Sequence, residues 1–139
     1  VGVALIDCVV DVFLGDVFRP VNPWRAAGRM GGWAFRGIAG QGAAHLRYPQ
    51  RLGGLLGMSG YLPLADALDA ERSDANRLVP VFMAHGQFDD IIPIARATRS
   101  RDILHALGYD VTWHDYPMPH SVVMEEIADI GRWLTKVLA

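Results

Sequence analysis

The sequence predicts an α/β fold in which a parallel sheet is flanked by helices. Short apolar runs at 55–59, 79–84 and 111–116 are typical of buried strands. Amphipathic segments at 94–107 and 122–138 predict a helix between the last two strands and another after them. Because strands and helices alternate, right-handed crossovers are expected. We therefore predict that the three strands are adjacent and parallel and that both helices pack against them.

The two predicted helices carry recognisable signals at their ends. Gly108 lies where a C-terminal cap is expected for the first helix, and Ser121 is able to cap the start of the second. Glu125 and Glu126 follow in the opening turns, where the helix dipole favours negative charge. The core-facing positions of the first helix are expected to be Ile94, Ala97, Ile103, Leu104 and Leu107, and those of the second Val122, Ile127, Ile130, Leu134, Val137 and Leu138.

The N-terminal third is organised differently. Residues 1–14 are strongly apolar, but they include Asp7 and Asp11 and are too few to span a bilayer, so we predict one buried strand or two short ones and no membrane span. Residues 15–44 are rich in Gly, Pro, Arg and Trp and predict loop with short pieces of structure. Residues 43–48 suit the end of a helix, because the residue before a proline avoids the α region.

Length and composition bound the class of protein. A chain of 139 residues is expected to form a single domain over 1–139. Its net charge of −2 gives no sign of the excess positive charge that nucleic-acid binding requires. The single cysteine, Cys8, excludes an intramolecular disulfide and fits a reducing compartment, so a cytoplasmic protein is expected.

Two loops carry the residues of a catalytic acid and base. Asp89 follows the strand at 79–84, and His120 follows the strand at 111–116. Because the carboxyl ends of parallel strands lie at one edge of a sheet, these side chains can meet there, as in a serine hydrolase. We expect the Asp89 carboxylate to accept a hydrogen bond from His120 over about 2.6 to 3.2 Å. In the alternative, Asp89 only caps its own turn and His120 is a surface loop residue.

The nucleophile is the missing part of this site. No Gly-x-Ser-x-Gly pentapeptide, the usual elbow of such enzymes, occurs in the chain. Of the four serines, Ser59 alone is expected to emerge on the catalytic edge, so it is the candidate substitute nucleophile. In the alternative, Ser59 satisfies local backbone groups and lines the pocket. His85 is expected to close its strand through internal hydrogen bonds rather than to take part in chemistry.

Residues 45–139 resemble the C-terminal part of the bacterial carboxylesterase/phospholipase family, which includes the acyl-protein thioesterases. The resemblance rests on Leu46-Arg47-Tyr48-Pro49-Gln50-Arg51-Leu52, Met58-Ser59-Gly60-Tyr61-Leu62-Pro63, His85-Gly86-Gln87-Phe88-Asp89-Asp90 and Tyr116-Pro117-Met118-Pro119-His120. It implies an α/β-hydrolase fold and a small acyl-ester substrate, with thioesters and lysophospholipids as further candidates. It also implies that no cofactor is needed, that Asp89 orients the histidine and that His120 is the general base. A metal site is not expected, because no zinc-binding spacing such as His-Glu-x-x-His occurs in the chain.

Residues 1–44 diverge from this family. Where family members have Gly-Phe-Ser-Gln-Gly-Gly, this chain has Gly37-Ile38-Ala39-Gly40-Gln41-Gly42, which puts Ala39 or Gly40 at the serine position. We expect the opening strands of the full fold to be missing, through truncation, rearrangement or an altered reading frame. Unless residues 1–14 replace one of those strands, an edge of the sheet is exposed and self-association is expected. The alternative function is therefore an inactive hydrolase-like scaffold that binds a partner or another copy of itself.

Overall fold

A five-stranded sheet is the centre of the protein in the computed structural model, which describes residues 2–6, 9–13 and 45–139. The predictions for residues 15–44, including the serine position at Ala39 or Gly40, lie outside this part of the chain. The strands lie side by side in chain order: β1 (Gly2–Ile6), β2 (Val9–Phe13), β3 (Leu55–Met58), β4 (Val81–Gly86) and β5 (Val111–Tyr116).

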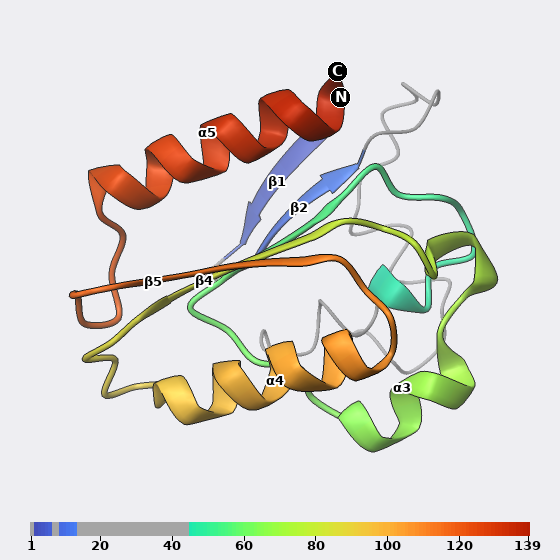
Figure 1. Cartoon of the computed structure of the whole chain (residues 1–139), viewed down its shortest axis with the longest axis horizontal. Coiled ribbons are helices and arrows are strands. Elements are labelled where there is room, and N and C mark those ends of the chain that lie inside the picture. Colours follow the sequence, from blue (N-terminus) through green and yellow to red (C-terminus); the bar gives the residue numbers. More distant parts are fainter. Residues whose placement is uncertain (1, 7–8, 14–44) are drawn as a thin grey trace.

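The predicted parallel arrangement of the last three strands is confirmed. β3 pairs with β4 from Leu55↔Val81 onward, and β4 pairs with β5 from Val81↔Val111 onward, both in parallel. Helix α4 (Ile94–Ala106) covers one face of the sheet and helix α5 (Met124–Leu138) covers the other (Figure 1). The carboxyl ends of β4 and β5 therefore lie together at one edge.

The apolar N-terminal run forms two short strands, which is one of the two arrangements that the sequence predicted. β1 and β2 make an antiparallel hairpin, and β2 pairs antiparallel with β3 through Val9↔Gly57 and Val10↔Leu56. The run thus occupies the position next to β3 that would otherwise be an open edge. None of the helices in the described part of the chain combines the length and the apolar character that a bilayer crossing requires.

A separate apolar core lies on each face of the sheet. The face under α4 buries side chains from the strands, from α4, from helix α3 (Ala65–Glu71) and from the connecting segments: Leu46, Leu52, Leu55, Leu68, Val79, Val81, Met83, Leu104, Tyr109 and Val111. The face under α5 buries Leu56, Met58, Phe82, Ala84, Tyr116, Met118, Ile130 and Trp133. Every residue of β4 is buried because this strand has a neighbour on both sides and a helix on both faces.

Helix α4 follows its predicted face only in part, because Ile94, Ile103 and Leu107 are partly buried rather than buried. Ala97 and Leu104 are buried as expected, but the third buried residue is Ser100. Its hydroxyl donates to the carbonyl of Arg96 and accepts from the amide of Leu62, each over 2.8 Å, so a polar side chain is satisfied inside the core. The helix ends at the predicted glycine, because Gly108 has a φ of 86°, a conformation that side chains disfavour.

Helix α5 begins later than predicted, and only part of its predicted core face is buried. Its N-cap is Val123, without a side-chain hydrogen bond, so the prediction that Ser121 caps it is wrong. Val122 and Ile127 are 52% and 48% exposed, so their predicted places in the core are also wrong. The predicted core positions Ile130, Leu134 and Val137 do pack in the core, together with Trp133, and Glu126 is fully buried on the same side.

The short helices between β3 and β4 were not predicted. Helix α3 buries only Leu68, which is too little apolar periodicity to recognise in seven residues. It is followed by the 3-10 helix η2 (Asp74–Asn76), in which Asn76 is fully buried. The Asn76 side chain accepts from the amide of Leu52 over 2.8 Å and donates to the carbonyls of Tyr48 and Gln50 over 2.8 and 2.9 Å. These three bonds hold the loop that leads into β3.

Glu126 makes folding stability depend on pH. Neither of its carboxylate oxygens has a hydrogen-bond partner in the described part of the chain, and burial raises its pKa. A carboxyl with a raised pKa destabilises the fold as pH increases from about 4.3, the unfolded value, through the folded value. We expect Glu126→Gln, which resembles the protonated form, to be more stable than the wild type at pH 7 by about 1 kcal/mol or more.

The expected stabilisation is measured by urea unfolding at several pH values. The difference between Glu126→Gln and the wild type should shrink towards a pH of about 4, where Glu126 itself becomes protonated. Glu125→Gln is the matched control, because Glu125 lies on the exposed side of the same helical turn. A stability difference that is unchanged between acidic and neutral pH would show that the charge of Glu126 is not its cause.

Candidate active site

The acid of the site lies in a tight loop directly after β4. Asp89 is 7% exposed, and its Oδ1 accepts hydrogen bonds from the amides of Ile91 and Ile92 over 2.9 and 2.8 Å. Through these bonds Asp89 caps its own turn, which was the predicted alternative to a catalytic role. They occupy only one carboxylate oxygen, so the side chain is fixed in orientation while Oδ2 remains available to another group.

His120 occupies that second position. Its Nδ1 lies 2.8 Å from Oδ2 of Asp89, so the predicted hydrogen bond between the two side chains is confirmed. The aspartate side chain is fully buried, whereas the histidine side chain is 26% exposed. Asp89 is therefore a buried acid in contact with His120, which solvent can reach. Both residues lie at the edge of the sheet where β4 and β5 end. This is the geometry expected of an acid that fixes a histidine tautomer.

The surroundings keep Asp89 ionised. Burial alone would raise its pKa, but the hydrogen bonds from the amide of Ile92, the ring of His120 and the amide of Ile91 together lower it below the ordinary value. At neutral pH the carboxylate is thus a negative charge that accepts hydrogen bonds. A proton on Nδ1 of His120 is held by this charge, which leaves Nε2 as the nitrogen that can accept a proton.

Backbone contacts hold the acid loop and the histidine loop together. The amide of Gln87 donates to the carbonyl of Tyr116 over 2.8 Å, and the amide of Phe88 donates to the carbonyl of Met118 over 3.1 Å. Beside them, Gly86 is packed so closely that a Cβ atom there would lie 2.4 Å from the carbonyl oxygens of both Met118 and Pro119. The role of this glycine was not predicted, because the requirement comes from a distant segment of the chain rather than from a local turn.

Ser59 lies at the same edge, at the end of β3. It is 4% exposed, its amide donates to the carbonyl of Ala84 over 2.8 Å, and it has a φ of 50°, which is uncommon for a residue other than glycine. The backbone contact with β4 is part of the structural role that was the alternative for this residue. Its role as a nucleophile stays a prediction.

Comparison with known proteins places this arrangement in a family. A family model described as phospholipase/carboxylesterase matches residues 40–138. The chain belongs to the phospholipase/carboxylesterase family. Among curated proteins, acyl-protein thioesterase 1 of Gibberella zeae is 43% identical over 98 residues, which are 68% of this chain and 42% of that protein. Acyl-protein thioesterase 1 of Yarrowia lipolytica is 40% identical over 87 residues, which are 60% of this chain and 38% of that protein.

Solved structures agree on the fold. The crystal structure of Zea mays acyl-protein thioesterase 2 is 28% identical with a TM-score of 0.64, over 73% of this chain and 51% of that one. The predicted family and the α/β-hydrolase-like fold class are confirmed, although the curated relatives named above are fungal, not bacterial. The chain spans less than half the length of these two fungal relatives.

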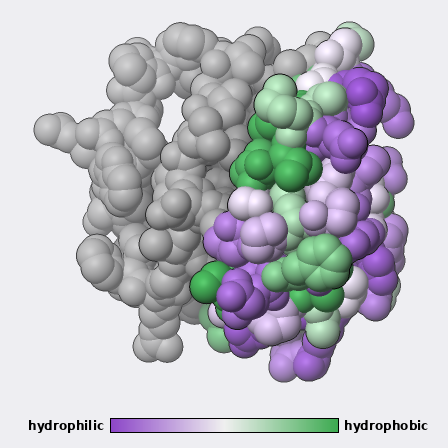
Figure 2. Space-filling view, turned by 90° about the vertical axis from the view of Figure 1, so that its left-hand side faces the viewer, coloured by the Kyte–Doolittle hydropathy of each residue, from purple (hydrophilic) through white to green (hydrophobic). Residues whose placement is uncertain are grey.

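Exposed apolar side chains flank both residues of the pair. Phe88 and Ile91 lie on either side of Asp89 in the chain and are 67% and 68% exposed, and Val122 and Met124 follow His120 and are 52% and 80% exposed. Figure 2 looks onto the edge at which β4 and β5 end, and hydrophobic residues gather there among hydrophilic ones. In this member of the phospholipase/carboxylesterase family, the described surface beside the acid and base is therefore partly apolar.

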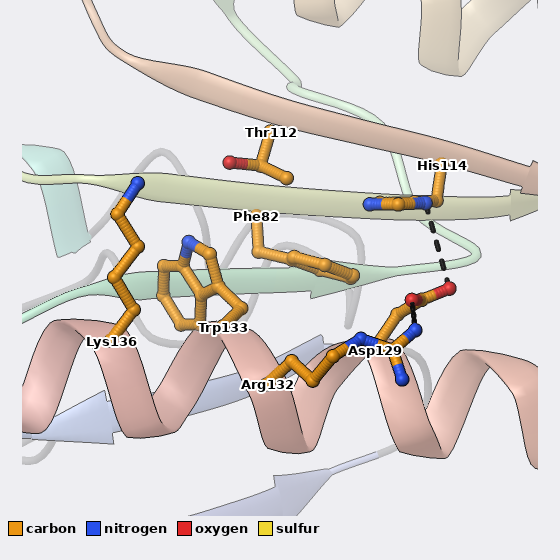
Figure 3. A pocket seen from close by; sticks show the side chains of 7 residues that line it. All are labelled: Phe82, Thr112, His114, Asp129, Arg132, Trp133 and Lys136. Carbon is orange, nitrogen blue, oxygen red and sulfur yellow. Dashed lines mark hydrogen bonds and ion pairs between the residues drawn. The ribbon is translucent and has the colours of Figure 1, made fainter.

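A groove of about 240 Å³ lies elsewhere, between the sheet and α5 (Figure 3). It is lined by Phe82, Thr112, His114, Asp129, Arg132, Trp133 and Lys136. The ring of His114 stacks on Phe82 at 5.3 Å, and its Nδ1 lies 3.6 Å from the Asp129 carboxylate, which also accepts the Tyr116 hydroxyl over 2.8 Å. Neither Asp89 nor His120 lines this groove, so it is separate from the candidate site.

A metal centre is not part of the described site. Within residues 2–6, 9–13 and 45–139, no three His, Cys, Asp or Glu side chains are grouped so that they could hold an ion. That the site works without a cofactor stays a prediction.

Proposed function

We propose that this chain is a serine hydrolase of the carboxylesterase type that cleaves short acyl esters, with Asp89 and His120 as its acid and base. The observation that carries the proposal is the 2.8 Å contact between Nδ1 of His120 and the buried Asp89 carboxylate. Asp89 holds the imidazole in one tautomer and stabilises the imidazolium that forms when Nε2 takes the proton of an attacking hydroxyl. His120 later returns that proton to the leaving alcohol or thiol.

The surface beside the pair fits an acyl substrate. The exposed side chains of Phe88, Ile91, Val122 and Met124 offer apolar contacts to a hydrocarbon chain, which would gain free energy by leaving water. Thioesters are candidate substrates because the matching relatives are called acyl-protein thioesterases, and lysophospholipids are candidates because the family is described as phospholipase/carboxylesterase. The proposal needs no cofactor, because the protein supplies the nucleophile, the acid and the base.

Ser59 is the nucleophile in this proposal. It is buried at the end of β3, next to the strand that leads into the Asp89 loop, and a positive φ at a strand end turns the chain sharply. We expect a fluorophosphonate probe to label Ser59, as mapped by mass spectrometry of peptides, and Ser59→Ala to abolish hydrolysis of p-nitrophenyl butyrate. Ser73→Ala is the control, because the Ser73 hydroxyl caps η2.

The labelling experiment separates the proposal from its alternative. Label on another residue, or unchanged turnover by Ser59→Ala, would exclude Ser59. If the folded chain takes up no label and hydrolyses no ester, the inactive scaffold that binds a partner or another copy of itself becomes the better account. Self-association is tested separately by light scattering. Because β2 covers the edge of β3, it would have to use an outer edge of the described sheet, at β1 or β5, and a clean monomer at high concentration would contradict it.

A further inference from the structure

His85 is a second histidine in contact with the candidate acid. It lies near the end of β4 with no exposed surface, and its Nε2 is 2.7 Å from the carbonyl oxygen of Ile92 and 3.3 Å from Oδ2 of Asp89. The shorter contact spans the whole acid loop, from the strand to the residue seven positions later. Nδ1 of His85 is buried and has no hydrogen-bond partner in the described part of the chain.

These contacts define the protonation state of His85. A carbonyl oxygen can only accept, so the hydrogen lies on Nε2 and points to Ile92 and Asp89. A second hydrogen on Nδ1 would be a buried donor without an acceptor, on a charged ring without solvent contact, which is the costlier arrangement. His85 is therefore a neutral imidazole with its hydrogen on Nε2, unlike His120, whose Nδ1 faces the carboxylate.

The bond to Ile92 bears on the orientation of Asp89. The amide of Ile92 is one of the two donors that hold Oδ1 of Asp89, and the carbonyl of the same residue is the acceptor for His85. His85, which lies on β4, thus holds Ile92 in place, and Ile92 in turn holds the Asp89 carboxylate. Its Nε2–H also lies near Oδ2, the oxygen that faces His120.

We propose that His85 is a positioning residue. As a neutral donor it binds the Ile92 carbonyl to the end of β4. This contact holds the Asp89 carboxylate in the orientation that His120 requires. This assigns His85 a part in the site, beyond the predicted role of closing its own strand. The inference deepens the proposed function and rests on it. Its test therefore includes signals that do not depend on whether the chain turns over an ester.

The experiment is nuclear magnetic resonance of the imidazoles in the full 15N-labelled chain, together with p-nitrophenyl butyrate kinetics. We expect the wild-type His85 ring to show the neutral pattern with hydrogen on Nε2, and His120 to show a low-field Nδ1–H signal protected by its bond to Asp89. In His85→Leu the His120 signal should be lost through exchange, and kcat should fall about 10- to 100-fold with KM little changed. In His85→Gln, whose amide keeps a neutral donor near the Nε2 position, both should be largely restored.

Three results would overturn the inference. The first is a wild-type His85 that is protonated or carries its hydrogen on Nδ1. The second is a folded His85→Leu with the wild-type His120 signal. The third is a folded His85→Gln in which that signal is lost, and this variant decides the matter if His85→Leu does not fold. His105→Leu is the matched control, because His105 is exposed on α4. An inactive wild type would contradict the proposed function, while the imidazole signals would still test His85.

Discussion

Asp89→Asn should lower kcat for ester hydrolysis by about 10⁴-fold, the effect of removing the acid from a Ser-His-Asp system. The carbonyl oxygen of the substituted side chain can still accept from the amides of Ile91 and Ile92, as Oδ1 of Asp89 does, so the loop keeps its turn. The amide group of that side chain would then face His120 and present a donor where the carboxylate presented an acceptor. His120 is thereby forced to carry its hydrogen on Nε2, where the base needs a lone pair.

The neighbouring residue supplies the control for this change. Asp90 is exposed and has the same charge, so Asp90→Asn changes the net charge equally without touching His120. We expect Asp90→Asn to retain kcat within about twofold to threefold, since an exposed charge surrounded by water contributes little. Equal losses in the two variants, measured with p-nitrophenyl butyrate at neutral pH, would mean that the Asp89 contact with His120 is not the source of the effect.

Gly86→Ala should both destabilise the protein and impair the site. A Cβ atom at Gly86 would lie 2.4 Å from two backbone oxygens, those of Met118 and Pro119, which cannot rotate away as a side chain could. The acid loop and the histidine loop must then separate. Overpacking of this kind costs about 1 to 3 kcal/mol of folding free energy, and a displacement of about 1 Å costs about 10²-fold in rate.

Gly57→Ala is the matched control for this substitution. Gly57 also lies in the sheet, but among the described side chains and backbone the nearest atom to a Cβ there is the carbonyl oxygen of Phe82 at 3.9 Å, an ordinary contact distance. Urea unfolding should therefore show a large loss of stability for Gly86→Ala and a small change for Gly57→Ala. Comparable stabilities for the two variants would contradict the close packing of the histidine loop on Gly86.

The parts of the fold that could be predicted are those with a strong local pattern. The apolar runs at β3, β4 and β5 identify buried strands, and Gly108 marks the end of α4 through its freedom to adopt a positive φ. The order of strand and helix then leaves few arrangements, because crossovers between parallel strands are right-handed. The meeting of Asp89 and His120 follows from this order, since each lies in the loop after a parallel strand.

The parts that could not be predicted depend on contacts between distant segments. Ser100 and Glu126 are polar in sequence but buried in the structure, and one of the two hydrogen bonds that satisfy the serine comes from the distant amide of Leu62. The predicted core face of α5 was wrong at Val122 and Ile127, because Glu126 and Trp133 take inward positions beside the correctly predicted Ile130. A hydrophobicity pattern assigns an inward place to apolar residues and misses a buried carboxyl.

The most direct measurement is the rate of p-nitrophenyl butyrate hydrolysis by the wild-type chain and by His120→Gln at equal concentration. The variant keeps the approximate size and polarity of the side chain but has no group that accepts a proton at neutral pH. If His120 is the base that Asp89 orients, the wild type should exceed the buffer rate and His120→Gln should lose at least about 10³-fold in kcat/KM. A wild type no faster than buffer, or a variant as fast as the wild type, would contradict the proposed function.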